Sequence, residues 1–383
     1  MSRPAPDLDL PLTLGLRHRV RFVADALDPA DAALGELLDG DAPRAIAFVD
    51  AAVAEARPGL EGQLQRYLAA RAPRVRLVGP LRRVPGGEAV KSEPGNLLPI
   101  LQQISGAGID RHSYVIAIGG GALLDVVGFA AAVAHRGVRL IRLPTTTLAQ
   151  ADSGVGVKNG VNAYGKKNYL GTFAAPWGVV MSRAFLDTLP LRQWRHGFAE
   201  AVKVAVVKDA AFFLEIEANS AALCNGDRAA GWPVIVRSAT LHALHIATGG
   251  DPFELTTARP LDFGHWAAHR LETMTGGELP HGEAVAIGVA LDTAYAARTG
   301  LLAPDAADRI TRCLTALGLP VSHSALADAD DLLAGLDEFR EHLGGRLTVT
   351  LPRAIGDAVD VHAIDPAAMR ACLAEAAAAR AIH

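Results

Sequence analysis

Two groups of residues in this 383-residue chain could do chemistry, and the first is a set of polar side chains within a glycine-rich stretch. Asp152, Lys158 and Lys167 alternate there with Gly, Val and Asn. Fixed ammonium groups beside amide and carboxylate side chains are typical of a site that binds a phosphorylated, hydroxylated ligand. The alternative is an ordinary surface loop whose lysines only face water. We favour the ligand site, because the surrounding residues are small and leave room for a lined pocket.

The second group has the residue types that bind a metal ion. Glu200 lies in HGFAEAVK, His265 in LDFGHWAAH and His281 in LPHGEAV. Zinc accepts histidine nitrogens and carboxylate oxygens, and three protein ligands with one open position make a catalytic site. Each residue alone has an ordinary explanation, since histidines often cap helices and Glu200 could pair with Lys203 on one helix face. Their occurrence together with the lysine-rich stretch favours one active site between two domains.

A third feature is Gly119-Gly120-Gly121, which follows an apolar run typical of a buried parallel strand, Tyr114 to Ile118. Glycines at such a point let the backbone approach a ligand, and the next helix directs its amide donors at an anion. The pattern is not GxGxxG, so the usual dinucleotide fingerprint is absent. From these residues alone, a tight turn without a ligand stays equally open.

The elements that must position these residues change character along the chain. Strands are expected over residues 44–49, 75–78, 114–118, 138–143 and 177–181, with helices between them. This alternation predicts a parallel sheet covered on both faces. Helices are then expected over residues 191–208, 210–222, 233–248, 265–274, 282–298, 304–316 and 366–381, with one strand at 347–351. The predicted fold is a Rossmann-like α/β domain over 1–184 and an all-α domain over 185–383.

Composition limits the class of protein. Half of the residues are hydrophobic and 20% are charged, which suffices for a large core in about two domains. The net charge is −4 without a polybasic run, so nucleic acid is not an expected partner. Three scattered cysteines without CxxC fit a reducing cytoplasm. No apolar run suits a signal peptide or a membrane span, so we expect a cytoplasmic protein that does not bind membranes.

Several motifs occur in one order along the chain. They are GGGxxxDxxGF, RG, PTTxLAQxDSxVGxK, GxKN, AExxK, FGHxxxH and HGExVAxG. By these motifs the chain resembles, over roughly residues 40 to 360, the sugar phosphate cyclase superfamily, whose best-known member is 3-dehydroquinate synthase. Within it the chain looks closest to the branch associated with ebo-type gene clusters, with features of 2-epi-5-epi-valiolone-type synthases.

The resemblance implies two cofactors and a role for each motif. NAD would be bound by Asp50, Glu88, Lys91, Gly119, Gly120, Gly121, Asp125, Thr145, Thr146, Lys167, Phe185, Thr188 and Leu189. Zinc, with cobalt chemically acceptable, would be bound by Glu200, His265 and His281. The substrate phosphate would be bound by Lys158, Asn168, His269 and Arg136, the arginine coming from the neighbouring subunit of a homodimer. Asp152, Lys167 and Lys203 would contact ring hydroxyls. From its position alone, Asp50 could equally cap the helix that follows it.

The implied reaction makes the chain a carbon–oxygen lyase acting on a small sugar phosphate. Oxidation of an alcohol by NAD gives a ketone, which the metal polarises, so the neighbouring proton becomes acidic and phosphate can leave. The hydride then returns, the sugar ring opens, and an intramolecular aldol reaction closes a carbocycle. NAD is therefore recycled within each turnover.

Three departures bear on the substrate. His242 stands where dehydroquinate synthases have a carboxylate-binding lysine, Asp262 stands where they have asparagine, and Arg259 lies near an expected arginine in a loop of different length. We therefore expect a heptulose 7-phosphate without a carboxylate, such as sedoheptulose 7-phosphate. Dehydroquinate synthase proper stays an alternative, because Arg259 or a protonated His242 could bind a carboxylate. A metal-dependent alcohol or glycerol dehydrogenase and a non-catalytic sugar-phosphate-binding relative are alternatives from other classes.

Overall fold

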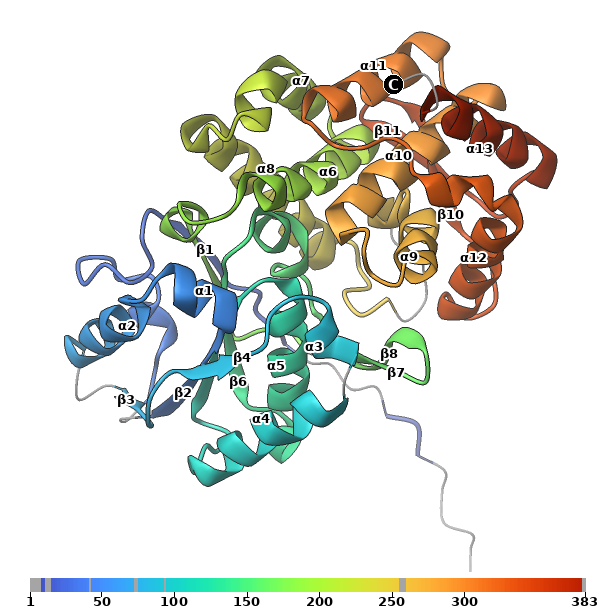
Figure 1. Cartoon of the computed structure of the whole chain (residues 1–383). Helices are drawn as coiled ribbons and strands as arrows, with labels where there is room; N and C mark the ends of the chain where they lie inside the picture. Colours follow the sequence, from blue (N-terminus) through green and yellow to red (C-terminus); the bar gives the residue numbers. More distant parts are fainter. Residues whose placement is uncertain are drawn as a thin grey trace, which may run out of the picture.

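The computed structural model describes residues 8–10, 15–40, 43–71, 75–92, 94–254 and 260–380. Figure 1 shows two parts, a sheet with helices on its faces and a group of helices above it. This matches the predicted combination of a Rossmann-like parallel sheet with a helical C-terminal region. The boundary near residue 184 stays a prediction.

The sheet is parallel throughout, as the alternating pattern predicted. Its strand order is β1 (Val20–Val23), β9 (Gly178–Ser182), β6 (Arg139–Pro144), β5 (Tyr114–Gly119), β2 (Arg44–Asp50), β3 (Arg76–Leu77), and β4 (Arg82–Val84) also pairs with β2. Every residue of β5 is buried, because helices cover both faces of a parallel sheet. Ile116 packs with α1 (Ala51–Ala56) and α2 (Leu60–Ala69) on one face. Val115 packs with α4 (Pro94–Gly106) and α5 (Gly121–Val133) on the other.

The carboxyl ends of the central strands meet at one edge of the sheet. Gly119 at the end of β5 is in register with Pro144 at the end of β6, and Ile118 is in register with Val49 of β2. The residues that follow these strands therefore lie side by side. This is the edge at which open parallel sheets bind nucleotides.

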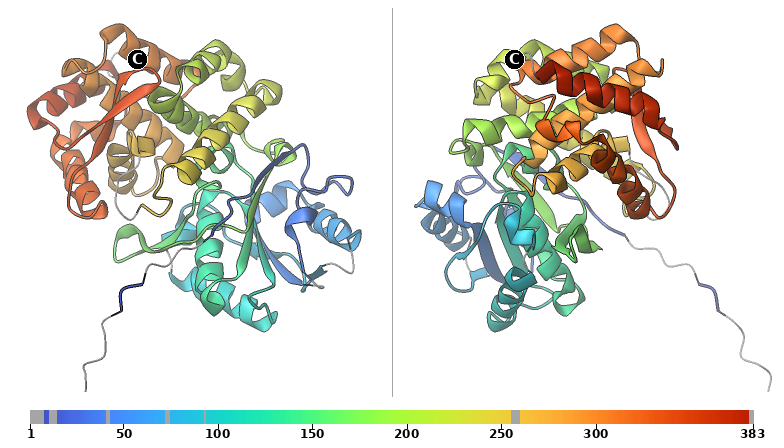
Figure 2. Two further views of the ribbon diagram at one scale, coloured as in Figure 1. Left: turned by 180° about the vertical axis from the view of Figure 1, so that it is seen from behind. Right: turned by 45° about the vertical axis from the view of Figure 1, so that its right-hand side comes forward.

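The C-terminal region is built mainly from helices. They are α6 (Leu191–Lys208), α7 (Ala210–Cys224), α8 (Arg228–Thr248), α9 (His265–Met274), α10 (His281–Arg298), α11 (Pro304–Ala316), α12 (Ala329–His342) and α13 (Pro366–Arg380). Nearly all of α6 beyond its first turn and most of α10 are buried, so these two helices form the centre of this region. Figure 2 shows this helical region above the sheet from two further sides. A hairpin of β10 (Val349–Ala354) and β11 (Asp357–Val361) packs against both of them.

Four differences from the sequence prediction concern the lysine-rich stretch and the C-terminal region. The lysine-rich stretch forms a hairpin of β7 (Lys158–Ala163) and β8 (Lys166–Phe173), which the sequence did not reveal. Helix α8 begins five residues early because Asp227 caps it, accepting from the N–H groups of Ala229 and Ala230. Helix α12 was not predicted. The strand expected at 347–351 pairs with a second strand after it, β11, which was not predicted.

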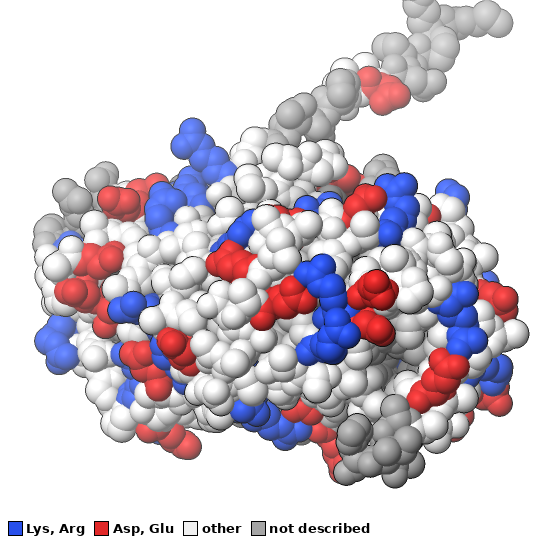
Figure 3. Space-filling model, turned by 90° about the horizontal axis from the view of Figure 1, so that it is seen from above, with Lys and Arg blue, Asp and Glu red and all other residues white. Residues whose placement is uncertain are grey.

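The described surface carries both signs of charge. Figure 3 shows acidic and basic side chains interspersed over one face. No helix in the described ranges is both long and apolar enough to cross a bilayer.

Candidate functional site

The predicted metal ligands converge although they come from three helices. Glu200 lies in the buried middle of α6, and His265 and His281 are the first residues of α9 and α10. Nε2 of His281 lies 3.4 Å from Glu200 Oε1, and Nε2 of His265 lies 3.7 Å from the same oxygen. Zinc bonds of about 2.0–2.2 Å in a tetrahedral arrangement place ligand atoms roughly 3.4 Å apart. These three residues, called here the metal cluster, therefore fit a single ion.

The other ring nitrogen of each histidine already has a partner. His265 Nδ1 lies 3.2 Å from the carbonyl oxygen of Phe263, and His281 Nδ1 lies 3.1 Å from Glu272 Oε2. Such contacts fix the tautomer and direct Nε2 at the ion, as in most protein metal sites. The donor set and its orientation thus both fit a metal with two histidines and one carboxylate.

Close packing sets the positions of the two histidines. Gly264, just before α9, has a φ of +77°, and a Cβ there would lie 2.6 Å from the backbone nitrogen of Val289 in α10. Gly282 follows His281, and a Cβ on it would lie 2.5 Å from Cβ of His196 in α6. Only glycine lets α9 and α6 approach α10 this closely. In the FGH and HGE motifs, the glycine therefore allows the close helix packing that sets the position of the neighbouring histidine.

Charges in the metal cluster favour ionised Glu200. Although burial opposes it, the neighbouring Lys203 ammonium and His281 lower the pKa of Glu200 to about 2. Burial holds the pKa of His265 well below its usual value, so this ring is neutral and ready to donate to a metal. The carboxylates of Glu272 and Glu200 outweigh burial at His281 and raise its pKa to about 10. A metal ion must therefore displace a proton from His281.

A second ionic group adjoins the metal cluster. The Lys203 ammonium is buried, 2.6 Å from Glu200 Oε2 and 3.7 Å from Asp152 Oδ1. Asp152 lies in a π-helical turn, Ala149–Ser153, and His242 Nδ1 approaches its Oδ1 to 3.0 Å. Burial would lower the pKa of Lys203, but Asp152, Glu200 and Asp262 raise it, so the side chain keeps its charge. The ion pair that the sequence suggested for Glu200 and Lys203 is thus present. It occurs together with the arrangement of Glu200, His265 and His281 that fits a metal ion.

The β7–β8 hairpin brings lysines toward this group. Lys167 Nζ lies 2.7 Å from Glu272 Oε1 on α9, and Lys158 Nζ lies 2.7 Å from Glu254 Oε2. His269 is one turn beyond His265, and its ring stacks on His281 with centroids 5.9 Å apart. Asn168 is exposed on β8, with a φ of +52° and its backbone N–H bonded to Asn162 Oδ1.

Residues expected to bind the nucleotide lie at the carboxyl edge of the sheet. Lys91 on α3 (Ala89–Ser92) is buried, with Nζ 2.7 Å from Asp125 Oδ2 on α5 and 3.9 Å from Glu88 Oε1. Asp50 caps α1 by accepting from the N–H of Ala52 at 2.9 Å. The helix-cap alternative for Asp50 is therefore present, and its role toward a ribose stays a prediction.

The remaining nucleotide candidates differ in accessibility. Thr146 Oγ1 accepts from the N–H of Ala149, and buried Thr145 Oγ1 has no hydrogen-bond partner among the described residues. Phe185 and Leu189 are buried in the cores of the two regions, whereas Thr188 is exposed. Gly119, Gly120 and Gly121 lead from β5 into α5 as expected. The side chains of Phe185 and Leu189 thus pack inside the protein, and their role toward NAD stays a prediction.

Comparison with known proteins identifies the family. Residues 82–196 match the family model described as 3-dehydroquinate synthase N-terminal, and residues 197–338 match 3-dehydroquinate synthase C-terminal. A 3-dehydroquinate synthase of Bradyrhizobium sp. is 40% identical over 294 residues, covering 74% of this chain and 76% of the relative. A 2-epi-valiolone synthase of Actinosynnema mirum is 35% identical over 370 residues, covering 96% and 94%. The chain belongs to the sugar phosphate cyclase superfamily.

A solved structure agrees with this cyclase over its length. ValA, a 2-epi-5-epi-valiolone synthase from Streptomyces hygroscopicus subsp. jinggangensis 5008, superposes with a TM-score of 0.87 at 32% identity. The match covers 97% of this chain and 100% of ValA, whose structure has NAD+ and Zn2+ bound. The predicted family and fold are thus confirmed, and the cyclase is an enzyme of the 3-dehydroquinate synthase-like lyases.

One predicted arginine, Arg136, does not join the site within this chain. Arg136 is exposed beyond the end of α5 and just before β6 begins. It therefore lies at the amino edge of the sheet, opposite Gly119–Gly121, about 20 Å away along a helix of this length. Arg259 lies outside the described residues. A role of Arg136 in this site would require a second subunit.

Sequence reasoning missed two residues of the cyclase. Glu272 lies three residues after His269 and seven after His265, a spacing that places all three on one face of α9. Arg142 is completely buried in β6. A charged residue within this apolar strand could have indicated a structural or functional role. Its guanidinium donates to the carbonyls of Gly154 and Gly156 and to Asn159 Oδ1. Arg142 therefore holds the segment between Asp152 and Lys158 in place.

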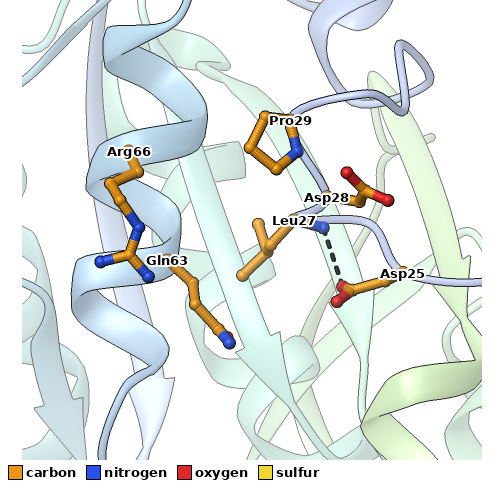
Figure 4. Close-up of a pocket in the computed structure, with 6 residues that line it drawn as sticks. All are labelled: Asp25, Leu27, Asp28, Pro29, Gln63 and Arg66. Carbon is orange, nitrogen blue, oxygen red and sulfur yellow. Dashed lines mark hydrogen bonds between the residues drawn. The ribbon is translucent and has the colours of Figure 1, made fainter.

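Another hollow of the cyclase lies away from this chemistry. Figure 4 shows a surface pocket of about 240 Å³ between α2 and the loop after β1. It is lined by Asp25, Leu27, Asp28, Pro29, Gln63 and Arg66. Asp25 accepts the N–H of Leu27 at 3.0 Å and so shapes its own loop. None of the predicted site residues lines this pocket.

Proposed function

We propose that this cyclase converts a heptulose 7-phosphate without a carboxylate, of the sedoheptulose 7-phosphate type, into a carbocycle with loss of phosphate. The observation that carries the proposal is the convergence of the metal cluster, buried Lys203 and Asp152 in one place. A Lewis-acid site beside a fixed ammonium and a carboxylate suits acidification of a C–H next to a ketone.

The proposed cofactors are NAD and zinc, with cobalt acceptable to the same donors. Glu200, His265 and His281 would hold the metal, and the residues at the carboxyl edge of the sheet would hold NAD. When bound, NAD would supply a reversible hydride acceptor and the metal would supply a Lewis acid. The likeness to ValA over its whole length supports both assignments.

The cyclase's own residues would handle charge and protons. Lys203 stays protonated and stabilises negative charge that develops on a substrate oxygen. Burial opposes ionisation of Asp152, but Lys203 and His242 lower its pKa to about 2, so it orients ring hydroxyls as a carboxylate. Lys167 would contact a hydroxyl from the hairpin side.

The phosphate would bind on the hairpin side of the metal cluster. Lys158, Asn168 and His269 are proposed to hold it, and Arg136 is proposed to come from the second subunit of a homodimer. The position of Arg136 at the far edge of the sheet supports this arrangement. Arg259 stays a proposed substrate residue on the sequence alone.

Local charge supports a substrate without a carboxylate. Although desolvation lowers it, the carboxylates of Asp262 and Glu254 raise the pKa of Lys158, and Asp262 also acts on Lys203. His242 is already in contact with Asp152. A further carboxylate from the substrate would be repelled by Asp262 and would compete with Asp152 for His242.

The test is phosphate release from sedoheptulose 7-phosphate and from 3-deoxy-arabino-heptulosonate 7-phosphate, in the presence of NAD and zinc. We expect faster release from sedoheptulose 7-phosphate, a cyclised product in the NMR spectrum and no net NADH. Faster turnover of the heptulosonate would contradict the substrate and would instead assign 3-dehydroquinate synthase proper.

Dehydroquinate synthase is kept as the second candidate because curated relatives with that activity are about as similar as the valiolone synthase. The valiolone synthase match nevertheless extends over more of the chain. Net accumulation of NADH without released phosphate would instead favour an alcohol or glycerol dehydrogenase.

A further inference from the structure

One buried carboxylate connects the metal cluster to the β7–β8 hairpin. Glu272 is 4% exposed on α9, and its two oxygens face different partners. Oε2 lies 3.1 Å from Nδ1 of the metal ligand His281, and Oε1 lies 2.7 Å from Nζ of Lys167. A single side chain thus touches a residue of α10 and a residue of β8.

Because Glu272 is buried, losing one of these contacts costs more free energy than losing a contact at the surface. A carboxylate removed from water is costly unless each oxygen has a partner, and losing one partner of a buried pair costs several times more than losing a surface pair. His281 and Lys167 are the partners here, and they hold the plane of the carboxylate between them. The orientation of the His281 ring therefore depends on where Lys167 holds Glu272.

The ionic contacts continue into the α/β region, but more weakly. Lys167 Nζ lies 3.8 Å from Glu88 Oε1, and Glu88 lies 3.9 Å from Lys91, which pairs with Asp125 at 2.7 Å. The Glu88 side chain is 44% exposed, so these longer contacts are screened by solvent. The strong part of the connection is the segment from His281 through Glu272 to Lys167.

We infer that Glu272 is a positioning residue that fixes the metal ligand His281 and couples it to Lys167, so that the hairpin and the metal cluster act as one unit. This inference rests on the proposed function, because it requires a metal at Glu200, His265 and His281. Glu272 itself does not need to touch the substrate or the ion.

The test measures metal binding and does not depend on turnover. Zinc affinity is determined by competition with a chromophoric chelator for wild type, Glu272→Gln, Lys167→Met and the double variant. Glu272→Gln should weaken zinc binding about 10- to 100-fold, as expected for loss of a carboxylate behind a metal-bound histidine. Lys167→Met should weaken it at least about twofold in the wild-type background and not at all in the Glu272→Gln background.

Two matched controls separate positioning from general destabilisation. Lys166 neighbours Lys167 on β8 and pairs with Glu341 at 2.6 Å, and Glu217 on α7 pairs with Arg309 on α11 at 2.6 Å. Lys166→Met and Glu217→Gln should leave zinc affinity unchanged. The absorption spectrum of the cobalt-loaded protein should change in Glu272→Gln and stay unchanged in both controls, because it reports the ligand geometry directly.

Four results would overturn the inference. Zinc affinity of Glu272→Gln within twofold of wild type would show that the carboxylate does not position His281. Equal effects of Lys167→Met in both backgrounds would show that the hairpin is not coupled. Two metal ions per chain, the second lost in Glu272→Gln, would make Glu272 a ligand together with His269, whose donor atoms also lie near those of His281. Absence of metal binding by wild type would overturn the proposed function as well.

Discussion

The metal cluster and the hairpin lysines face the same chemistry but are built differently. The metal cluster is fixed by packing: its ligands lie on three buried helices, and close contacts at Gly264 and Gly282 leave α10 one position. Lys158 and Lys167 lie on a two-stranded hairpin and are held by ion pairs, with Lys158 53% exposed. Groups held by packing have their geometry before a ligand binds, whereas groups held by ion pairs can exchange a protein carboxylate for a ligand anion.

The largest effect on activity is expected from a change in the metal cluster. Glu200→Gln removes the one anionic ligand, and an amide cannot replace it as a strong metal donor. Bound zinc should be lost and phosphate release should fall by at least about 10³-fold. Metal analysis of the purified variant, with Glu217→Gln as the control, checks this. Retention of stoichiometric zinc by Glu200→Gln would contradict the assigned ligand set.

Lys203→Met separates charge stabilisation from metal binding. The ammonium lies between Glu200 and Asp152, where it can stabilise developing negative charge. Its loss should lower kcat about 10²- to 10³-fold, in the range measured for fixed donors in active sites. Zinc should be retained, because removing a cation beside the site does not remove a ligand. Loss of zinc from Lys203→Met would show that the lysine has a structural role in the metal cluster instead.

Lys158→Met tests whether the hairpin lysines bind the anion of the ligand. A hydrogen bond to a charged group is worth about 1.5–3 kcal/mol, so KM for the sugar phosphate should rise about 10- to 150-fold. The change in kcat should be smaller, and high salt should reduce the difference because Lys158 is half exposed. Steady-state phosphate release at two ionic strengths measures both effects. An unchanged KM would place the phosphate elsewhere.

The packing that holds His265 is expected to affect stability rather than turnover. Asp292 on α10 accepts the N–H of Gly264 and Nε1–H of Trp266, and burial raises its pKa to about 7 despite these donors. The unfolded chain therefore releases this proton at lower pH than the folded protein. The unfolding free energy of wild type relative to Asp292→Asn should fall by at most about 1.4 kcal/mol per pH unit between pH 4 and 7 and level off above pH 7.

Denaturant unfolding of both proteins across this pH range measures the difference. A wild-type minus variant difference that rises with pH would show that Asp292 is ionised in the folded state, stabilised by its two donors.

The sequence predicted the metal cluster better than the hairpin lysines. FGH and PHGE each contain a histidine and a glycine at a close helix contact, α9 against α10 at Gly264 and α6 against α10 at Gly282, so motif and geometry coincide. The lysine-rich stretch gave its residue types but not its hairpin, because glycine and asparagine obscure the alternation by which strands are recognised. Glu272 was missed because its partner Lys167 is remote in sequence, and Arg142 because one charge in a strand does not show which carbonyls it meets. The proposed role of Arg136 would depend on a second subunit, which one sequence does not position.

The metal cluster is tested most directly by locating the ion. Crystals of the protein grown with cobalt or zinc would be measured at the absorption edge of the metal to locate the ion by anomalous scattering. We expect one peak within about 2.0–2.2 Å of Glu200 Oε1, His265 Nε2 and His281 Nε2. A peak between His269, Glu272 and His281 instead, or none near Glu200, would contradict this ligand set.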